Sequence, residues 1–326
     1  MRPPLFEDPA IREWTAQFLR DRLPGARDGE VHFTLPSTGT KTPVAICALG
    51  DGSRVVVRLL KAWSIAARIA NTQKKMLGWG LPVPRLLAFS GSGRLGPPRS
   101  WLTVEEFLDG QPFTTHKRHP EPDHMARLGR TLARLHGVNR RLAGRIGLPL
   151  PRPYVTRYLP RSLERVGKLR GLLGDRRAAE LRRDLKARAA AIGARPRYEL
   201  LHGHVNSGNF VMGADECWLI DFDAVRFGDF AQDLVRAVHR LTGDVPERQE
   251  ALLASYFAHF AGEGAGPHVP TRAEYERLLP FYEADFQVSR AVGMRRKEQR
   301  GRHDEDHTKA MVERHVAEAA RALAAG

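Results

Sequence analysis

The chain has 326 residues, 42% of them hydrophobic and 27% charged, which is typical of a folded protein with one large domain or two lobes. Its two cysteines, Cys47 and Cys217, stand far apart, which argues against a disulfide framework or a cysteine-ligated zinc site. No apolar leader or membrane-length apolar segment is evident, so we expect a cytoplasmic protein, and the formal net charge of +15 favours anionic ligands without naming one.

The amino-terminal third has the pattern of a small sheet with helices. Apolar residues at helical spacing predict a short helix over 9–19, and an alanine-rich segment predicts another over 62–77. The second helix should end before Pro82, because proline cannot continue a helix. Runs rich in β-branched or aromatic residues predict strands at 31–35, 44–49, 54–60, 86–89 and 101–107. We therefore predict an N-lobe over residues 1–108, with a small antiparallel sheet.

The remainder of the chain, 109–326, is mainly helical in pattern. Leu128 and Leu132 belong to a stripe with the spacing of a buried helix face. Residues 152–197 are rich in arginine but poor in aromatic residues that could stack on bases, which favours solvated helix faces over nucleic-acid binding. We predict an α+β fold in which this part forms the larger, mostly helical C-lobe.

One segment, 200–234, combines apolar strands with polar residues at their ends. The first strand leads to His202 and His204, and Asn209 follows in the next turn of chain. A second apolar strand ends at Asp221. Asn209 and Asp221 both offer hard oxygen ligands, which suit Mg²⁺ held beside substrate phosphates. The segment therefore predicts one wall of a binding cleft.

The order of these residues resembles the signature of the aminoglycoside phosphotransferase family and its choline-kinase-like relatives. That signature contains His-Gly-Asp, an asparagine, Ile-Asp-Phe, Gly-Asp and Asp-Leu in this order. The matching residues here are His202-Gly203-His204, Asn209, Ile220-Asp221-Phe222, Gly228-Asp229 and Asp233-Leu234. Weaker matches occur at 81–87, 104–110 and 128–136. The resemblance implies a protein-kinase-like two-lobed fold.

The resemblance also implies a site for ATP and Mg²⁺. Asn209 and Asp221 would hold the metal on the ATP phosphates, and Arg58 would pair with those phosphates. Asp229 and Asp233 would stabilise the residues of the site without binding the ligand themselves. The residues implied to bind the nucleotide, including a covering loop and a hinge, are Ser37, Gly39, Arg58, Glu105, Phe107, Asn209 and Asp221.

Two residues of the family pattern are replaced. The aspartate that accepts the proton of the substrate hydroxyl falls at His204, and loss of such a base typically costs about 10²–10⁴-fold in rate. A neutral histidine can itself accept a proton near pH 7, and Asp223 is the other candidate for this catalytic role. The glutamate expected on the helix over 62–77 has no counterpart at the matching positions, which are Ala70, Asn71 and Gln73.

The leading hypothesis is an ATP- and Mg²⁺-dependent phosphotransferase acting on a hydroxyl of a small molecule. The basic helical region favours a neutral or anionic acceptor. The main alternative is a catalytically inactive pseudokinase that binds a nucleotide or serves as a scaffold. A metallohydrolase built on His202 and His204, and a nucleic-acid-binding module supported by charge alone, are less favoured. The sequence does not predict an oligomeric state.

Overall fold

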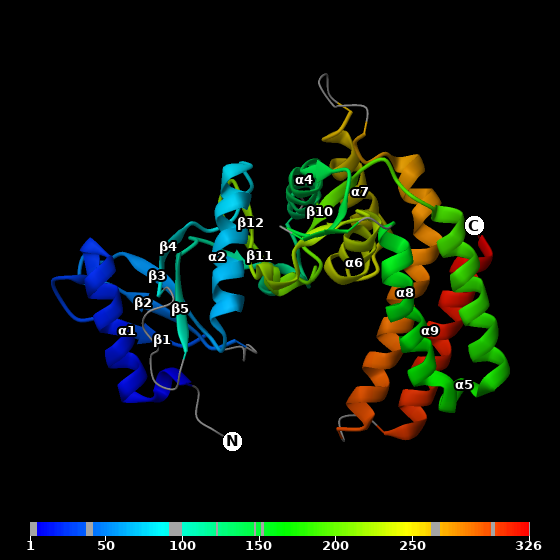
Figure 1. Cartoon of the computed structure of the whole chain (residues 1–326), viewed down its shortest axis with the longest axis horizontal. Coiled ribbons are helices and arrows are strands. Elements are labelled where there is room, and N and C mark those ends of the chain that lie inside the picture. Colours follow the sequence, from blue (N-terminus) through cyan, green and yellow to red (C-terminus); the bar gives the residue numbers. More distant parts are fainter. Residues whose placement is uncertain are drawn as a thin grey trace. The chain divides into compact units, whose positions relative to one another are not determined.

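The computed structural model describes residues 5–36, 42–90, 100–121, 123–146, 148–150, 153–261, 268–300 and 304–325. The chain forms two units (Figure 1). The first unit comprises Met1–Phe113 with Gly208–Asp223, and the second comprises Thr114–Ser207 with Ala224–Gly326. Strands dominate the first unit and helices the second, which confirms the predicted α+β class.

The first unit is built on a five-stranded antiparallel sheet with the order β1-β2-β3-β5-β4. Its strands are β1 (His32–Thr34), β2 (Val44–Ala48), β3 (Arg54–Leu60), β4 (Leu86–Phe89) and β5 (Trp101–Glu106). Val55, Val57 and Leu59 are buried because alternate side chains of β3 point to the same face. The helix α1 (Pro9–Arg22) packs on that face, so Arg58 projects from the opposite one.

The helix α2 (Trp63–Gly78) corresponds to the alanine-rich segment of the sequence. Ala66 and Ile69 pack against the end of β3. The side-chain amide of Gln73 donates a 2.7 Å hydrogen bond to the carbonyl oxygen of Pro84, which fixes the chain that enters β4. The predicted helix end before the proline-rich turn is confirmed.

A three-stranded sheet with the order β12-β11-β6 completes the first unit. Its strands are β6 (Gln111–Pro112), β11 (Phe210–Met212) and β12 (Cys217–Leu219). β11 and β12 form a hairpin, and just beyond their paired residues the amide of Ile220 donates to the carbonyl oxygen of Asn209 at 3.0 Å. This bond places Asn209 beside the residue that precedes Asp221.

The second unit contains a five-stranded sheet with the order β7-β10-β13-β8-β9. Its strands are β7 (Asn139–Arg140), β8 (Ala143–Arg145), β9 (Leu148–Leu150), β10 (Tyr198–Leu201) and β13 (Arg226–Gly228). The helices around it are α3 (Phe113–His116), α4 (His124–Gly137), α6 (Ala231–Leu241) and α7 (Pro246–Ala258). Leu128 and Leu132 are buried, which confirms the apolar stripe predicted for α4. Short 3-10 turns occur at η1 (Leu5–Glu7), η2 (Pro24–Ala26), η3 (Ser207–Asn209) and η4 (Phe222–Ala224).

Long helices form the rest of the second unit. They are α5 (Tyr154–Ile192), α8 (Arg272–Glu298) and α9 (Glu305–Ala325), which pack side by side (Figure 1). Gly174 has φ of 75° and breaks α5 into two arms. The arms run antiparallel, since Arg182 of the second arm donates to the carbonyl oxygen of Leu163 in the first at 2.9 Å. Within the described residues, none of the helices combines the length and apolar character needed to span a membrane.

Candidate functional site

In the first unit, a single arginine lies between two carboxylates from different strands. Arg58 projects from the middle of β3, and its side chain is 12% exposed. Its Nη1 atom lies 3.8 Å from Glu105 Oε1 on β5, and its Nη2 atom lies 3.7 Å from Asp221 Oδ1 just after β12. Because these groups come from distant parts of the chain, the sheet itself assembles the cluster.

Asp221 occupies an unusual backbone conformation. Its φ is 68°, in the left-handed region that few non-glycine residues adopt, although aspartate and asparagine tolerate it better than most. The turn follows the β11–β12 hairpin, whose other end carries the buried Asn209. Residues held in such conformations cluster at functional sites. The hairpin thus brings together the two predicted metal ligands in one unit.

The electrostatics of this cluster show an excess of negative charge. Burial raises the pKa of Glu105, the charge of Arg58 opposes that shift, and the charges of Asp221 and Asp223 reinforce it. The Oε1 atom of Glu105 is buried and accepts no hydrogen bond from the described groups. Two carboxylates therefore flank one guanidinium, and the charge of Asp223 acts on the same cluster. A divalent cation coordinated by Asp221 and Asn209 would offset this imbalance, so the donor set fits Mg²⁺.

The partner of Arg58 was not foreseen from the sequence. α2 carries no acidic residue, Gln73 is engaged with the chain before β4, and Arg58 instead meets Glu105. Glu105 had been expected beside the nucleotide as part of a hinge. The spacing of 47 residues between Arg58 and Glu105 hides the contact, which depends on β3 pairing with β5.

In the second unit, the turn at His202 and His204 is held by a buried carboxylate. The amide of Gly203 donates to both carboxylate oxygens of Asp233, each at 3.1 Å. The amide of His204 donates to Nδ1 of His202 at 3.3 Å, and the His204 side chain itself is exposed. Gly203 has φ of 77°, and a Cβ atom there would lie 2.6 Å from the carbonyl oxygen of Ala224. The turn therefore requires glycine.

Asp233 is fully buried yet strongly favours its ionised form. Burial alone would raise its pKa, but interactions with His136, Arg236 and His202 outweigh burial and hold the pKa well below the ordinary value. The Nε2 atom of His136 lies 3.8 Å from Asp233 Oδ2. An ionised carboxylate presents two acceptor oxygens to the single N–H of Gly203, so the charge and the backbone geometry support each other.

A second buried ion cluster surrounds Asp229. Arg195 donates to Asp229 at 3.1 Å and forms a two-bond pair with Glu199 at 2.7 and 3.0 Å. Glu199 also accepts from the amide of Phe230 at 3.2 Å, and Tyr282 donates to Asp229. The sequence offered no signal for this pairing, because the charges lie on separate elements.

The remaining predicted residues fall in different places. Phe107 follows β5, and the guanidinium carbon of Arg54 lies 3.9 Å from its ring centroid. Asp223 is exposed in the turn after Asp221. Ser37 and Gly39 lie outside the described residues. The roles of all these residues in ligand binding stay predictions.

Comparisons with known proteins add a family and a fold. The model of a family described as the phosphotransferase enzyme family matches residues 66–270, more than half of the chain. This match includes most of α2, the strand that carries Glu105, the turn at His204, and Asp221 just after β12. No curated protein matches the chain in sequence.

Solved structures resemble the chain over almost its whole length. A Ralstonia eutropha protein assigned as an aminoglycoside phosphotransferase has a TM-score of 0.68 at 14% identity, covering 96% of this chain and 97% of that one. Choline kinase from Cryptosporidium parvum has a TM-score of 0.61 at 10% identity, with coverage of 95% and 94%. Spectinomycin phosphotransferase APH(9)-Ia, solved with ADP and spectinomycin, has a TM-score of 0.58 at 13% identity, with coverage of 95% and 98%. The likeness confirms the expected kinase-like fold.

Proposed function

Because the chain belongs to the phosphotransferase enzyme family, we propose that it transfers the γ-phosphoryl group of ATP to a hydroxyl of a small molecule, with Mg²⁺ as cofactor. The observation that carries this proposal is the cluster of Arg58, Asn209 and Asp221 in the first unit. It combines a cation for phosphate oxygens with oxygen ligands for a metal. The ADP bound in the spectinomycin phosphotransferase structure is consistent with nucleotide use by a protein of this fold.

Each residue of the cluster has a distinct task in this proposal. Asn209 and Asp221 would hold Mg²⁺, which neutralises charge on the phosphates as they are transferred. Arg58 would bind a phosphate oxygen, and Glu105 would keep its guanidinium extended by the contact at 3.8 Å. Glu105 is thus a positioning residue, whose effect passes through Arg58. Phosphoryl transfer asks the protein mainly for positioning and charge stabilisation, which this cluster supplies.

The acceptor side of the reaction depends on His204. Its ring is exposed on a turn whose backbone is fixed by Gly203 and Asp233, so the ring stands at a defined point of the second unit. A neutral imidazole can take the proton of an acceptor hydroxyl near pH 7. We propose His204 as this base, with Asp223 as the second candidate. We propose further that the protein acts in the cytoplasm.

Calorimetric titration of ATP into the protein, with and without Mg²⁺, tests the nucleotide site. We expect binding that requires Mg²⁺ and weakens at least about tenfold in Asp221→Asn, because a charged metal ligand is lost while asparagine keeps the left-handed turn. The matched control is Asp51→Asn, an exposed aspartate of the same unit. Equal binding with and without Mg²⁺, or no binding at all, would refute the proposal.

An acceptor screen separates the enzyme from a pseudokinase. If MgATP binds, His204→Asp supplies the carboxylate found in the family pattern and should raise any phosphotransfer rate by about 10²-fold or more. Tight MgATP binding with no transfer by either protein would favour a nucleotide-binding scaffold, because the aspartate of the family pattern would then be insufficient to restore catalysis.

A further inference from the structure

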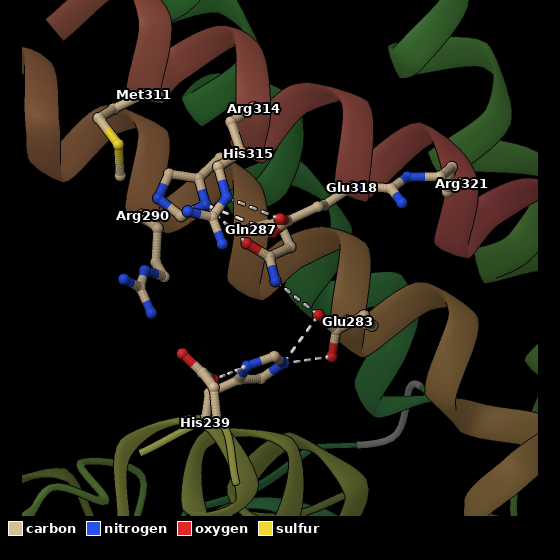
Figure 2. Close-up of a pocket in the computed structure, with 10 residues that line it drawn as sticks. His239, Glu283, Gln287, Arg290, Met311, Arg314, His315, Glu318 and Arg321 are labelled. Atoms are coloured by element: carbon tan, nitrogen blue, oxygen red, sulfur yellow. Dashed lines mark hydrogen bonds and ion pairs between the residues drawn. The ribbon is translucent and has the colours of Figure 1, made fainter. Parts of the chain in front are cut away.

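A cavity in the second unit lies between α8, α9 and the carboxyl end of α6 (Figure 2). Its volume is about 460 Å³, within the range of small-molecule sites. It is lined mainly by charged and polar side chains from the carboxyl end of α6 and the turn after it, the middle of α8 and the facing side of α9, with the apolar Met311 of α9. The nucleotide cluster described above uses none of these residues. A pocket of this size and polarity is suited to a small hydrophilic molecule.

The acidic side chains of the cavity already have partners. Both carboxylate oxygens of Glu283 lie 2.8 Å from Nε2 of His239, and Gln287 donates to one of them at 2.7 Å (Figure 2). Asp244 lies 3.3 Å from the other ring nitrogen of His239. Burial opposes the protonation of His239, but the two carboxylates outweigh it and raise its pKa. Both acids therefore already have a hydrogen-bonding partner within the cavity wall.

The same is true of Glu318 on α9, the third acid of the cavity. Arg314 donates to it at 3.1 Å across one helical turn. Each of the three carboxylates that line the cavity is therefore already engaged by Arg314 or by the ring of His239. A positively charged aminoglycoside-type acceptor would therefore find no free carboxylate among the described residues of this wall.

Some arginines of the cavity, in contrast, have no acidic partner among the described residues. Among the described residues, Arg290 and Arg321 line the cavity and form no ion pair. The guanidinium carbons of Arg290 and Arg240 each lie 5.8 Å from the ring centroid of Phe286. Burial, together with the charges of Arg236 and Arg290, lowers the pKa of Arg240. Like charges gathered without a counterion form a site that an anion would stabilise.

A buried ring nitrogen supplies a second, independent feature. His315 lines the cavity and is 3% exposed, and its Nδ1 donates to the side-chain oxygen of Gln287 at 2.8 Å. Burial and the charge of Arg290 lower the pKa of His315, so the neutral ring is favoured. Its Nε2 atom is therefore an acceptor, and no described group donates to it. This atom has almost no accessible surface, so a ligand hydroxyl would complement it once the side chains that cover it move aside.

The cavity and the turn at His204 share one helix end. His239 lines the cavity, while the next residue, Arg240, donates to the carbonyl oxygen of Val205 at 3.2 Å. We propose that this cavity binds the acceptor, and that the acceptor is a polyhydroxylated molecule carrying a phosphate or carboxylate group. This inference rests on the proposed phosphoryl transfer. In that step a hydroxyl oxygen of the acceptor bonds to the γ-phosphorus, the bond to ADP breaks, and the hydroxyl proton passes to His204.

Calorimetry with four probes tests the charge and the hydroxyl requirement. The probes are glucose 6-phosphate, gluconate, glucose and glucosamine, titrated into the whole chain without nucleotide. We expect one of the two anionic sugars to bind at least about tenfold more tightly than glucose, and glucosamine to bind most weakly, because each charged hydrogen bond contributes about tenfold or more. The stronger of the two anions identifies a phosphate or a carboxylate as the recognised group.

Variants then locate the binding. Arg290→Gln and Arg321→Gln remove exposed arginines without ion pairs, so both should fold and each should weaken the anionic probe about tenfold. The control is Arg177→Gln, an exposed arginine of α5 outside the cavity, which should bind as the parent does. Unchanged binding in both cavity variants, tighter binding of glucosamine, or no binding of either anion overturns the inference. Anion binding in a protein that fails to bind MgATP would instead refute the proposed phosphoryl transfer and leave the cavity as an anion site.

Discussion

Replacing Asp233 with asparagine tests whether one buried charge holds the turn that presents His204. Both carboxylate oxygens of Asp233 lie 3.1 Å from the amide nitrogen of Gly203 and share its N–H, and Asp233 has no exposed surface. Asparagine keeps the shape and one acceptor oxygen, so the variant removes mainly the charge. His136 and Arg236 would then face a neutral amide in place of a carboxylate.

The expected cost follows from the burial of these partners. Breaking a buried charge pair typically costs about 3–5 kcal/mol, and since asparagine retains one acceptor we expect about 3 kcal/mol for Asp233→Asn at pH 7. The pKa of Asp233 is lowered, so its stabilising effect is complete above its unfolded value near pH 4 and is lost as the pH falls toward the lower folded value. The difference between the two proteins should therefore shrink in acid.

Urea unfolding can follow each unit separately, because the aromatic residues are segregated. All five tryptophans lie in the first unit and all six tyrosines lie in the second: Trp14, Trp63, Trp79, Trp101 and Trp218, against Tyr154, Tyr158, Tyr198, Tyr256, Tyr275 and Tyr282. Asp233→Asn should shift the tyrosine absorbance transition and leave the tryptophan fluorescence transition nearly in place. Asp175→Asn, which alters an exposed ion pair of the second unit, should shift neither. A loss that is as large at pH 3.5 as at pH 7 would refute the assignment of the effect to the charge.

Two further substitutions probe the remaining features. Glu105→Gln should weaken MgATP binding, because Glu105 positions Arg58. The pKa of Glu105 is raised in the folded protein, so the parent should lose thermal stability relative to the variant as the pH rises above 4.5. Equal slopes of melting temperature against pH for the two proteins would contradict this. Gly203→Ala should destabilise the second unit by about 1–3 kcal/mol, since its Cβ would press on the Ala224 carbonyl at positive φ. Gly293→Ala, in open space on α8, should instead stabilise by up to about 1 kcal/mol, and equal urea midpoints for the two variants would count against the steric argument.

Local pattern predicted the parts of the site that depend on short-range structure. Asn209 and Asp221 lie at the two ends of one hairpin, so the spacing of apolar runs was enough to place them together. Apolar alternation likewise located β3 and hence Arg58. In each case the deciding interactions join residues that are close in sequence, where periodicity and turn residues carry the information.

Contacts between distant elements could not be predicted from the local sequence pattern. The pairing of β3 with β5 brings Glu105 to Arg58, yet strand order and register depend on packing of the whole sheet. Arg195 was hidden among many arginines expected to coat solvated helix faces, although it is buried and bonded to Asp229 and Glu199. An arginine-rich composition does not indicate which guanidinium group will be buried.

The assignment of Gly208–Asp223 to the first unit has a consequence for how the protein is made. During synthesis, β6 leaves the ribosome about 100 residues before β11, the strand it pairs with. The edge of β6 therefore stays unpaired and exposed until β11 is made, and by then much of the second unit has been translated. A fragment that stops at residue 113 lacks Asp221 and leaves Arg58 with one carboxylate instead of two. Nucleotide binding should thus begin only after about two thirds of the chain has been translated.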